Sequence, residues 1–189
     1  MLSKKAKIFI ISAPSGTGKS TLIEEILKLI TDLIKPVSYT TRAPRGEEIN
    51  GKDYNFVSEK EFKKLEAEGK FIETAVVYGN FYATSLETIN KSLDHGQNLI
   101  KDIDTQGALN IKKALKSNAV LIFVKPPTLN ELENRIRQRG TDSDTVIRDR
   151  LENAVKEIKE SIKYDHVIVN DSLSHTVLEL KSIIDGYIK

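Results

Sequence analysis

One stretch, IFIISAPSGTGKSTLIEEIL from Ile8 to Leu27, limits the possible folds of this chain more than any other segment. An apolar run is typical of a buried strand, a glycine-containing turn follows, and apolar residues then recur at helical spacing. Within the turn, residues 13–20 read A-P-S-G-T-G-K-S, which is G-x-x-x-x-G-K-[ST] with Ala13 in place of the first glycine. A strand that leads through such a turn directly into a helix predicts an α/β domain with a parallel sheet.

The turn has the chemistry of a triphosphate-binding loop (P-loop). Successive backbone N–H groups and the helix N-terminus surround an anion, Lys19 reaches the β- and γ-phosphates, and the Ser20 hydroxyl ligates Mg²⁺. Ala13 is compatible with this chemistry if its φ is negative, because only glycine adopts a positive φ at low cost. The alternative is a glycine-rich turn that binds nothing. We expect ATP to contact the whole turn, namely Ala13, Pro14, Ser15, Gly16, Thr17, Gly18, Lys19, Ser20 and Thr21.

The bulk composition is that of one ordinary soluble domain. The 189 residues carry a net charge of +2 without a long basic run, so we expect no nucleic-acid partner. Cysteine is absent from the sequence, which excludes disulfides and cysteine-ligated metals. No segment approaches the roughly 20 apolar residues that span a membrane. We therefore expect a cytoplasmic protein without a membrane partner, as a monomer or a homodimer.

Strand and helix signals alternate along the rest of the chain. Amphipathic spacing predicts one helix over residues 20–34 and a last helix over residues 174–188. Apolar runs predict further strands at NLIKDID, AVLIFVK and HVIVN. This alternation predicts a three-layer core, in which helices cover both faces of a parallel sheet. We assign the core to residues 1–37, 85–134 and 151–189.

Two segments interrupt the alternation. Residues 38–84 hold short strand signals, one helix with a capping box from Ser58 to Glu61, and a hairpin turn at Gly79. Residues 135–150 are polar and contain several arginines. Neither segment has the pattern of a core layer. We therefore expect a mixed α/β insertion and a helical lid, both able to move over a site.

Two acidic residues, Asp102 and Asp104, follow the apolar run of NLIKDID. A carboxylate at the end of a strand next to the P-loop organises Mg²⁺ in nucleotide-binding proteins. The alternative is a solvated strand end. Lys101 is unusual inside the apolar run and indicates either a sheet edge or a partner for a carboxylate.

A second motif offers a site for a phosphate monoester. In SYTTRAPRGEEINGKDYNF, Arg42 and Arg45 lie three residues apart in a loop interrupted by proline and glycine, and Tyr54 follows. Guanidinium groups donate paired hydrogen bonds to phosphate and carry the opposite charge. The alternative is a pair of exposed loop arginines.

The same segment resembles the signature of guanylate kinases, T-T-R-x-x-R-x-x-E-x-x-G-x-x-Y-x-F, and fills every position of it. Five further stretches are similar to that family in the same order: SAPSGTGKST, FIETAVVYGNFYATS, DIDTQG, RQRGTDS and VIVND. The resemblance covers nearly the whole chain. It implies an enzyme of purine nucleotide metabolism that transfers the γ-phosphoryl group of ATP to GMP with Mg²⁺, giving ADP and GDP. It also implies that residues 38–84 bind GMP and that residues 135–150 form the lid.

The resemblance implies which residues bind GMP. Its phosphate is expected to lie against Arg42, Arg45, Tyr54 and Tyr82. Its base is expected to lie against Ser38, Glu73, Thr84 and Asp104. The chemistry agrees, because a carboxylate accepts from guanine N1–H and the N2 amine, whereas a hydroxyl donates to O6. Adenine reverses this pattern and would leave the carboxylate facing an acceptor.

The metal, the ATP base and the catalytic groups are implied in the same way. Mg²⁺ is expected at Ser20 and Asp102, and the ATP base at Arg139 and Asn170. Phosphoryl transfer needs positioning and charge neutralisation rather than a protein nucleophile or a histidine base. The cations expected to stabilise the moving phosphoryl group are Lys19, Arg42, Arg135, Arg139 and Arg150.

Some positions depart from the family pattern, and two other functions remain open. Ala83 stands where the family has glycine, and Lys101 replaces a usually apolar residue. A small-molecule kinase with a different acceptor would use the same arginines, so that only Ser38, Glu73 and Thr84 argue for guanine. A non-catalytic binding module of the guanylate-kinase-like type would have a degraded P-loop, whereas this loop keeps its glycines, lysine and serine.

Overall fold

A computed structural model of the chain describes residues 5–77, 79–138, 140 and 142–188. Among these residues, five parallel strands form a central sheet in the order β2-β7-β1-β8-β9. The strands are β1 (Ile8–Ser12), β2 (Leu33–Ile34), β7 (Asn98–Asp102), β8 (Ala119–Lys125) and β9 (His166–Val169). Strand β1 lies in the middle of the sheet, and all five of its residues are buried. The parallel sheet predicted from the sequence is confirmed.

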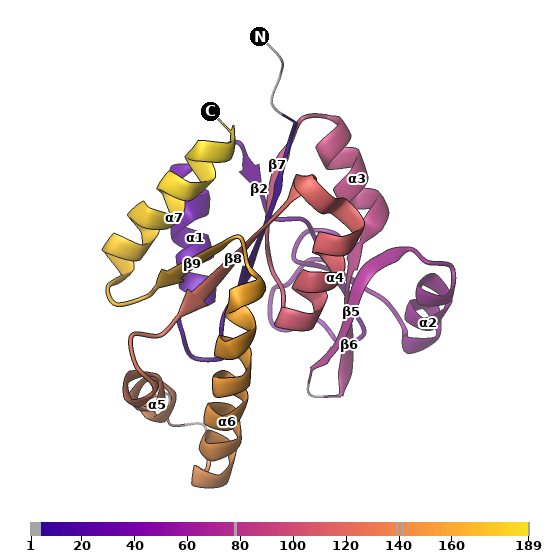
Figure 1. Cartoon of the computed structure of the whole chain (residues 1–189). Coiled ribbons are helices and arrows are strands. Elements are labelled where there is room, and N and C mark those ends of the chain that lie inside the picture. Colours follow the sequence, from indigo (N-terminus) through magenta and orange to yellow (C-terminus); the bar gives the residue numbers. More distant parts are fainter. Residues whose placement is uncertain (1–4, 78, 139, 141, 189) are drawn as a thin grey trace.

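Helices cover both faces of this sheet, as the alternation of signals predicted. Alternate residues of β1 belong to separate core clusters, with Phe9 and Ile11 in one and Ile8 and Ile10 in the other. The first cluster includes residues of α1 (Lys19–Leu29) and α7 (Leu173–Ile188). The second includes residues of α3 (Leu86–Asp94) and α4 (Thr105–Leu115). Figure 1 shows these helix pairs on opposite sides of the sheet, so the three-layer core is confirmed.

The predicted insertion forms a second sheet of its own, in the order β4-β3-β6-β5. Its strands are β3 (Ser38–Thr40), β4 (Tyr54–Phe56), β5 (Phe71–Val77) and β6 (Asn80–Ser85). Helix α2 (Glu59–Ala67) buries Phe62 against the rings of Phe71 and Phe81, with centroids 4.9 and 5.3 Å away. The Ser58 side chain accepts a hydrogen bond from the Glu61 N–H, and β5 and β6 pair antiparallel, as the sequence predicted.

The arginine-containing segment, residues 135–150, includes the end of α5 (Leu129–Gln138) and the start of α6 (Asp144–Glu160). The two helices pack together through a small cluster of Leu132, Ile136, Ile147 and Ala154, separate from the two core clusters. Short 3₁₀ turns at Lys116–Asn118 and Ser161–Lys163 precede β8 and β9. Within the described residues no helix is both long and apolar enough to cross a membrane.

One predicted element was wrong in its extent. The sequence predicted a helix over residues 20–34, but α1 ends at Leu29 and Leu33–Ile34 form the edge strand β2. Leu33 pairs with Asn98 of β7 and is 4% exposed. A helical extension and an edge strand both bury Leu33, so hydrophobic spacing alone does not distinguish them.

The position of β1 gives a prediction about stability. Ile10 is fully buried between β7 and β8, so Ile10→Ala removes packed methyl groups and leaves a cavity. We expect the free energy of unfolding in a urea titration to fall by about 2–5 kcal/mol. The control Leu178→Ala, at a side chain that is 63% exposed, should change it by less than about 0.5 kcal/mol. A similar loss in both variants would contradict the assignment of the core.

Candidate active site

Parallel pairing of β1 and β7 brings the P-loop and the acidic loop to the same edge of the sheet. Ile11 is paired with Asp102, and the Ser12 hydroxyl donates to the carbonyl of Ile103 at 2.7 Å. Two cavities open at this edge. The larger, of about 710 Å³, is lined by the P-loop, the hairpin tip and α6. The smaller, of about 260 Å³, lies between the acidic loop and the insertion.

The P-loop has the geometry of an anion site. Gly16 and Gly18 have φ of +96° and +93°, a region that side chains with a Cβ rarely adopt. A Cβ on Gly16 would lie 2.9 Å from Ile136, and one on Gly18 would lie 2.9 Å from the Asn170 amide nitrogen. In the described part of the chain, Lys116 is the only non-glycine residue with a positive φ. Ala13 therefore meets the condition that the sequence analysis set for it.

Asn170 and Arg135 tie the P-loop to neighbouring elements. The Asn170 side chain donates to the Thr17 carbonyl at 2.6 Å. Arg135 donates two hydrogen bonds to the Asn170 carbonyl, each of 3.2 Å, and one to Glu131 at 2.9 Å. The sequence analysis placed Asn170 at the ATP base and Arg135 at the phosphates. In this structure both side chains bind protein groups, and those two roles stay predictions.

Helix α6 contributes further groups to the larger cavity. Arg150 donates to the Ser15 hydroxyl at 3.1 Å and pairs with Asp142 at 3.3 Å. Asn153 and Glu157 line the cavity itself, and the sequence analysis missed both. They follow Arg150 by three and seven residues, so all three residues lie on one helix face. This spacing in the sequence could have indicated that Asn153 and Glu157 belong to the site. Arg139 lies outside the described residues.

Burial raises the pKa of the Glu157 carboxyl, while Lys19 partly opposes the shift. The group therefore takes up a proton more readily than an ordinary glutamate does.

Asp102 is the carboxylate best placed for a metal. Successive residues of β7 face opposite sides of the sheet, so Asp102 shares the face of Ile100, which packs in the cluster with α1. Its Oδ1 has no hydrogen-bond partner among the described residues, although Lys35 and Lys101 lie 3.6 Å away. Burial opposes its ionisation, but Lys101, Lys35 and Lys19 outweigh burial and lower the pKa of Asp102. The carboxylate is therefore charged at neutral pH.

An oxygen-only donor set of this kind fits Mg²⁺. Ser20 lines the larger cavity, and Asp102, which lines the adjacent smaller cavity, supplies a buried carboxylate oxygen. Magnesium takes few protein ligands and completes its shell with water and phosphate oxygens. Among the described side chains no group of three or more histidine, aspartate or glutamate residues is arranged around one point. The residues present therefore fit a metal that arrives with a phosphate ligand.

The smaller cavity has polar walls from two sheets. The Thr84 hydroxyl donates to Glu73 Oε1 at 2.6 Å, and Ser38 is 6% exposed on the first residue of β3. Tyr54 and Tyr82 also line it, with ring centroids 6.1 Å apart. Burial raises the pKa of Glu73, although the Thr84 hydrogen bond opposes the shift. The structure therefore brings together the predicted base and phosphate residues Ser38, Glu73, Thr84, Tyr54 and Tyr82.

Asp104 stands where the two cavities meet. It caps α4 by accepting from the Gly107 N–H at 2.7 Å. It lines both cavities together with Lys19 and Val77. The two cavities are therefore adjacent.

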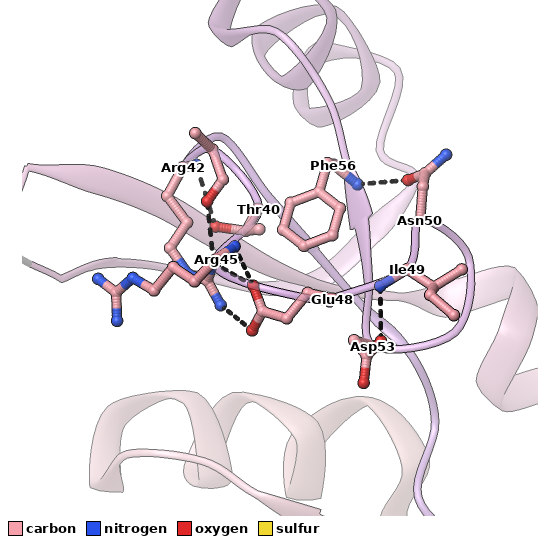
Figure 2. A network of polar contacts seen from close by, with 9 residues as sticks. Thr40, Arg42, Arg45, Glu48, Ile49, Asn50, Asp53 and Phe56 are labelled. Atoms are coloured by element: carbon pink, nitrogen blue, oxygen red, sulfur yellow. Dashed lines mark hydrogen bonds and ion pairs between the residues drawn. The ribbon is translucent and has the colours of Figure 1, made fainter.

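Arg42 is held in place by a glutamate to which the sequence analysis gave no role. Glu48 accepts from both terminal nitrogens of Arg42, at 2.6 and 2.7 Å, and from the Arg45 N–H at 2.8 Å (Figure 2). The Arg42 guanidinium lies over the Tyr54 ring, 4.9 Å from its centroid. The Arg42 hydrogen bonds lower the pKa of Glu48 to about 2. In the sequence, the position of Glu48 three residues after Arg45 could have indicated this ion pair.

The two arginines present their charges differently. The side chain of Arg42 is 9% exposed, whereas Arg45 is exposed and its guanidinium extends away from Glu48 (Figure 2). Arg42 keeps a fixed orientation through its ion pair, and Arg45 is free to turn toward a ligand. The loop thus combines one oriented and one adaptable cation.

These features define a class of protein before any comparison is made. A P-loop lies beside a strand-end carboxylate, and the second cavity is lined by two tyrosines, one of which carries Arg42 over its ring. This is the arrangement of a P-loop kinase that acts on a small phosphorylated acceptor.

Comparison with known proteins gives the particular family. The family model described as guanylate kinase matches residues 5–187. A guanylate kinase of Geobacter metallireducens is 46% identical over 97% of this chain and 90% of its own length. One from a Wolbachia of Brugia malayi is 40% identical over 94% and 91%. The crystal structure of guanylate kinase from Anaplasma phagocytophilum matches with a TM-score of 0.76 and 33% identity, covering 98% of this chain and 88% of its own.

The chain belongs to the guanylate kinase family. It is an enzyme, a nucleoside monophosphate kinase that phosphorylates GMP to GDP with ATP as the donor. The resemblance found in the sequence is thereby confirmed.

The Arg42–Glu48 ion pair predicts a pH dependence of stability. The pKa of Glu48 is lowered from 4.5 to about 2, so its stabilisation is complete above pH 4.5 and is lost as the pH falls toward 2. We expect Glu48→Gln to lower Tm at pH 7, and the difference from the parent protein to vanish near pH 2. Glu47→Gln, the same change at the neighbouring exposed position, is the control. A difference in Tm that does not depend on pH would contradict this role.

Proposed function

We propose that ATP occupies the larger cavity and GMP the smaller, and that the γ-phosphoryl group passes between them beside Lys19. The observation that carries this proposal is that Lys19 lines both cavities, at the first residue of α1. A cation at this junction neutralises charge on both nucleotides and on the group in transit. The P-loop, Ala13 to Thr21, surrounds the ATP phosphates with backbone N–H groups.

The GMP phosphate binds the guanidinium and phenol groups of the insertion. Arg42 and Arg45 supply charge and paired donors, with Arg42 over the Tyr54 ring. Tyr54 of β4 and Tyr82 of β6, which both line the smaller cavity, supply hydroxyls. The Arg42 side chain bound by Glu48 is already directed, so little further ordering is needed when the phosphate arrives.

The guanine base lies deeper in the smaller cavity, against Glu73, Ser38, Thr84 and Asp104. Glu73 accepts from N1–H and the N2 amine, which are the donors that adenine lacks on that edge. Because burial raises the pKa of Glu73, these donors stabilise a charged form that is costly in the empty site. GMP binding should therefore weaken as the pH falls toward the pKa of this carboxyl.

Mg²⁺ and the lid complete the site in this proposal. Ser20 and Asp102 would hold the ion, which supplies charge neutralisation at the phosphate oxygens. The cations of the lid, Arg135, Arg139 and Arg150, would turn to the phosphates when residues 135–150 close and exclude water. Residues 38–84 would act as the GMP-binding unit, and the remainder as the core. We also infer a cytoplasmic location and a monomer or homodimer without a nucleic-acid partner.

The first test addresses the P-loop. Lys19→Ala removes the cation shared by the two cavities, and we expect kcat to fall about 10³-fold. The fold should persist, since Lys19 is only partly buried at a helix terminus. The rate of ADP formation with Mg²⁺-ATP and GMP measures kcat, and far-UV circular dichroism measures folding. Lys28→Ala, on the exposed face of the same helix, is the control. Near-normal turnover of Lys19→Ala would refute the role of this lysine.

The second test addresses the acceptor. ADP release is measured with GMP, AMP, CMP, UMP or no acceptor, and only GMP should support rapid turnover. Glu73→Gln should lower kcat/KM for GMP about 100-fold, because a charged acceptor for two donors is lost. The KM for ATP should not change. Glu66→Gln, an exposed glutamate of α2, is the control. Equal losses for GMP and ATP would place the base site elsewhere, and turnover with another acceptor would refute the assignment of the smaller cavity.

A further inference from the structure

Lys101 is a buried lysine that the mechanism above does not use. It is only 8% exposed, and it follows the core residues Leu99 and Ile100 on β7. Alternation along the strand places Lys101 on the face of Leu99, opposite to the face of Asp102. Strand β2 pairs with β7 only at Asn98 and Leu99, so the lysine lies beyond the end of that neighbour.

Its ammonium group contacts the predicted base site. Lys101 Nζ donates to Ser38 Oγ at 2.5 Å, across 63 residues of sequence, and lies 3.6 Å from Asp102 Oδ1. Lys101 and Ser38 both line the smaller cavity, together with Glu73. Burial lowers the pKa of Lys101, while Asp102 and Glu73 favour its charged form.

The hydroxyls of Thr84 and Ser38 differ in whether their proton is available to a ligand. Thr84 has one O–H, and it is donated to Glu73 at 2.6 Å. Thr84 therefore has no second proton for a ligand while it keeps that bond. An ammonium group donates and never accepts, so Lys101 occupies a lone pair of Ser38 and leaves the serine proton unused by this contact.

We propose that Lys101 is a specificity-determining positioning residue, which fixes Ser38 as a hydrogen-bond donor and thereby selects an oxo group over an amino group on the purine ring. This inference rests on the proposed function, in which Ser38 faces O6 of guanine. The oxygen of Ser38 is held by the ammonium, and its proton points to the ligand acceptor.

An adenine ring would meet this arrangement unfavourably. Its amino group needs an acceptor, but the Ser38 oxygen is engaged by a cation, and the positive edge of the amino group would approach the charge of Lys101. Leaving a buried donor without its partner is costly, so the arrangement discriminates by mismatch as well as by attraction.

The experiment compares Lys101→Met, Lys35→Met, Ser38→Ala and the double variant Ser38→Ala/Lys101→Met in the full chain. Methionine keeps the length and removes the charge. Lys35→Met removes an equal charge at the same 3.6 Å distance from Asp102 without touching Ser38, which separates the effect on Asp102 from the effect on the hydroxyl. The readouts are KM for GMP, KM for ATP, kcat, and kcat/KM with AMP as acceptor.

We expect Lys101→Met to raise KM for GMP about tenfold and to raise the AMP-to-GMP ratio of kcat/KM by a similar factor. KM for ATP and kcat should stay within about twofold, because the interaction binds ground state and transition state alike. Lys35→Met should leave KM for GMP unchanged. The double variant should be no worse than Ser38→Ala, since Lys101 acts through that hydroxyl.

Several outcomes overturn the inference in distinguishable ways. If Ser38→Ala raises KM for GMP and Lys101→Met does not, the inference falls and the proposed function stands. If Ser38→Ala has no effect, both the inference about Lys101 and the assignment of the base site are refuted. Additive effects in the double variant, or an equal effect of Lys35→Met, would mean that Lys101 acts through charge rather than through Ser38. If Lys101→Met does not fold, Lys101→Leu, which also lacks a donor, is measured instead, with the same expected direction and the same criteria.

Discussion

The parallel pairing of β1 with β7 is the interaction on which the rest of the site depends. It carries Lys19, which follows β1 through the P-loop, and Asp102, which ends β7, to one edge of the sheet. The Ser12 hydroxyl bound to the Ile103 carbonyl holds the two strand ends together just before they diverge. Because the carboxyl ends of parallel strands share an edge, a cation and an anion that are distant in sequence lie at the same edge of the sheet.

The insertion and the helices α5 and α6 have apolar clusters of their own, around Phe62 and around Leu132. A unit with its own apolar core can move as a rigid body, whereas a segment packed into the central layers cannot. Both units nevertheless contribute polar residues that line the two cavities, Glu73 from one and Glu157 from the other. In the proposed mechanism, this division would reconcile two requirements, a rigid phosphate loop and substrate-binding walls that move.

Much of the fold was predictable because local physics decides it. The strand of β1, the Ser58 cap and the hairpin at Gly79 follow from apolar runs, side-chain capping and turn chemistry. In the smaller cavity, Lys19, Asp102, Asp104 and Tyr54 were predicted from the residues themselves. Ser38, Glu73, Tyr82 and Thr84 were predicted only through the family resemblance, since Glu73 alone is an ordinary strand residue. The end of α1 was mispredicted because Leu33 is buried by either structure. The partners of Arg42 and Lys101 depend on tertiary contacts between separate strands and loops, and no periodicity reports them.

The ion pair of Arg42 with Glu48 has a thermodynamic consequence. An arginine side chain has several rotatable bonds, and fixing them opposes any binding event that requires it. Here the bidentate contact and the Tyr54 ring remove that freedom when the chain folds. The Arg42 side chain therefore loses its conformational entropy when the chain folds, where burial of the hydrophobic core offsets the loss. Little of this entropy remains to be lost when substrate binds. In the proposed complex, affinity at this loop would be set partly by an acidic residue that repels the phosphate it helps to bind.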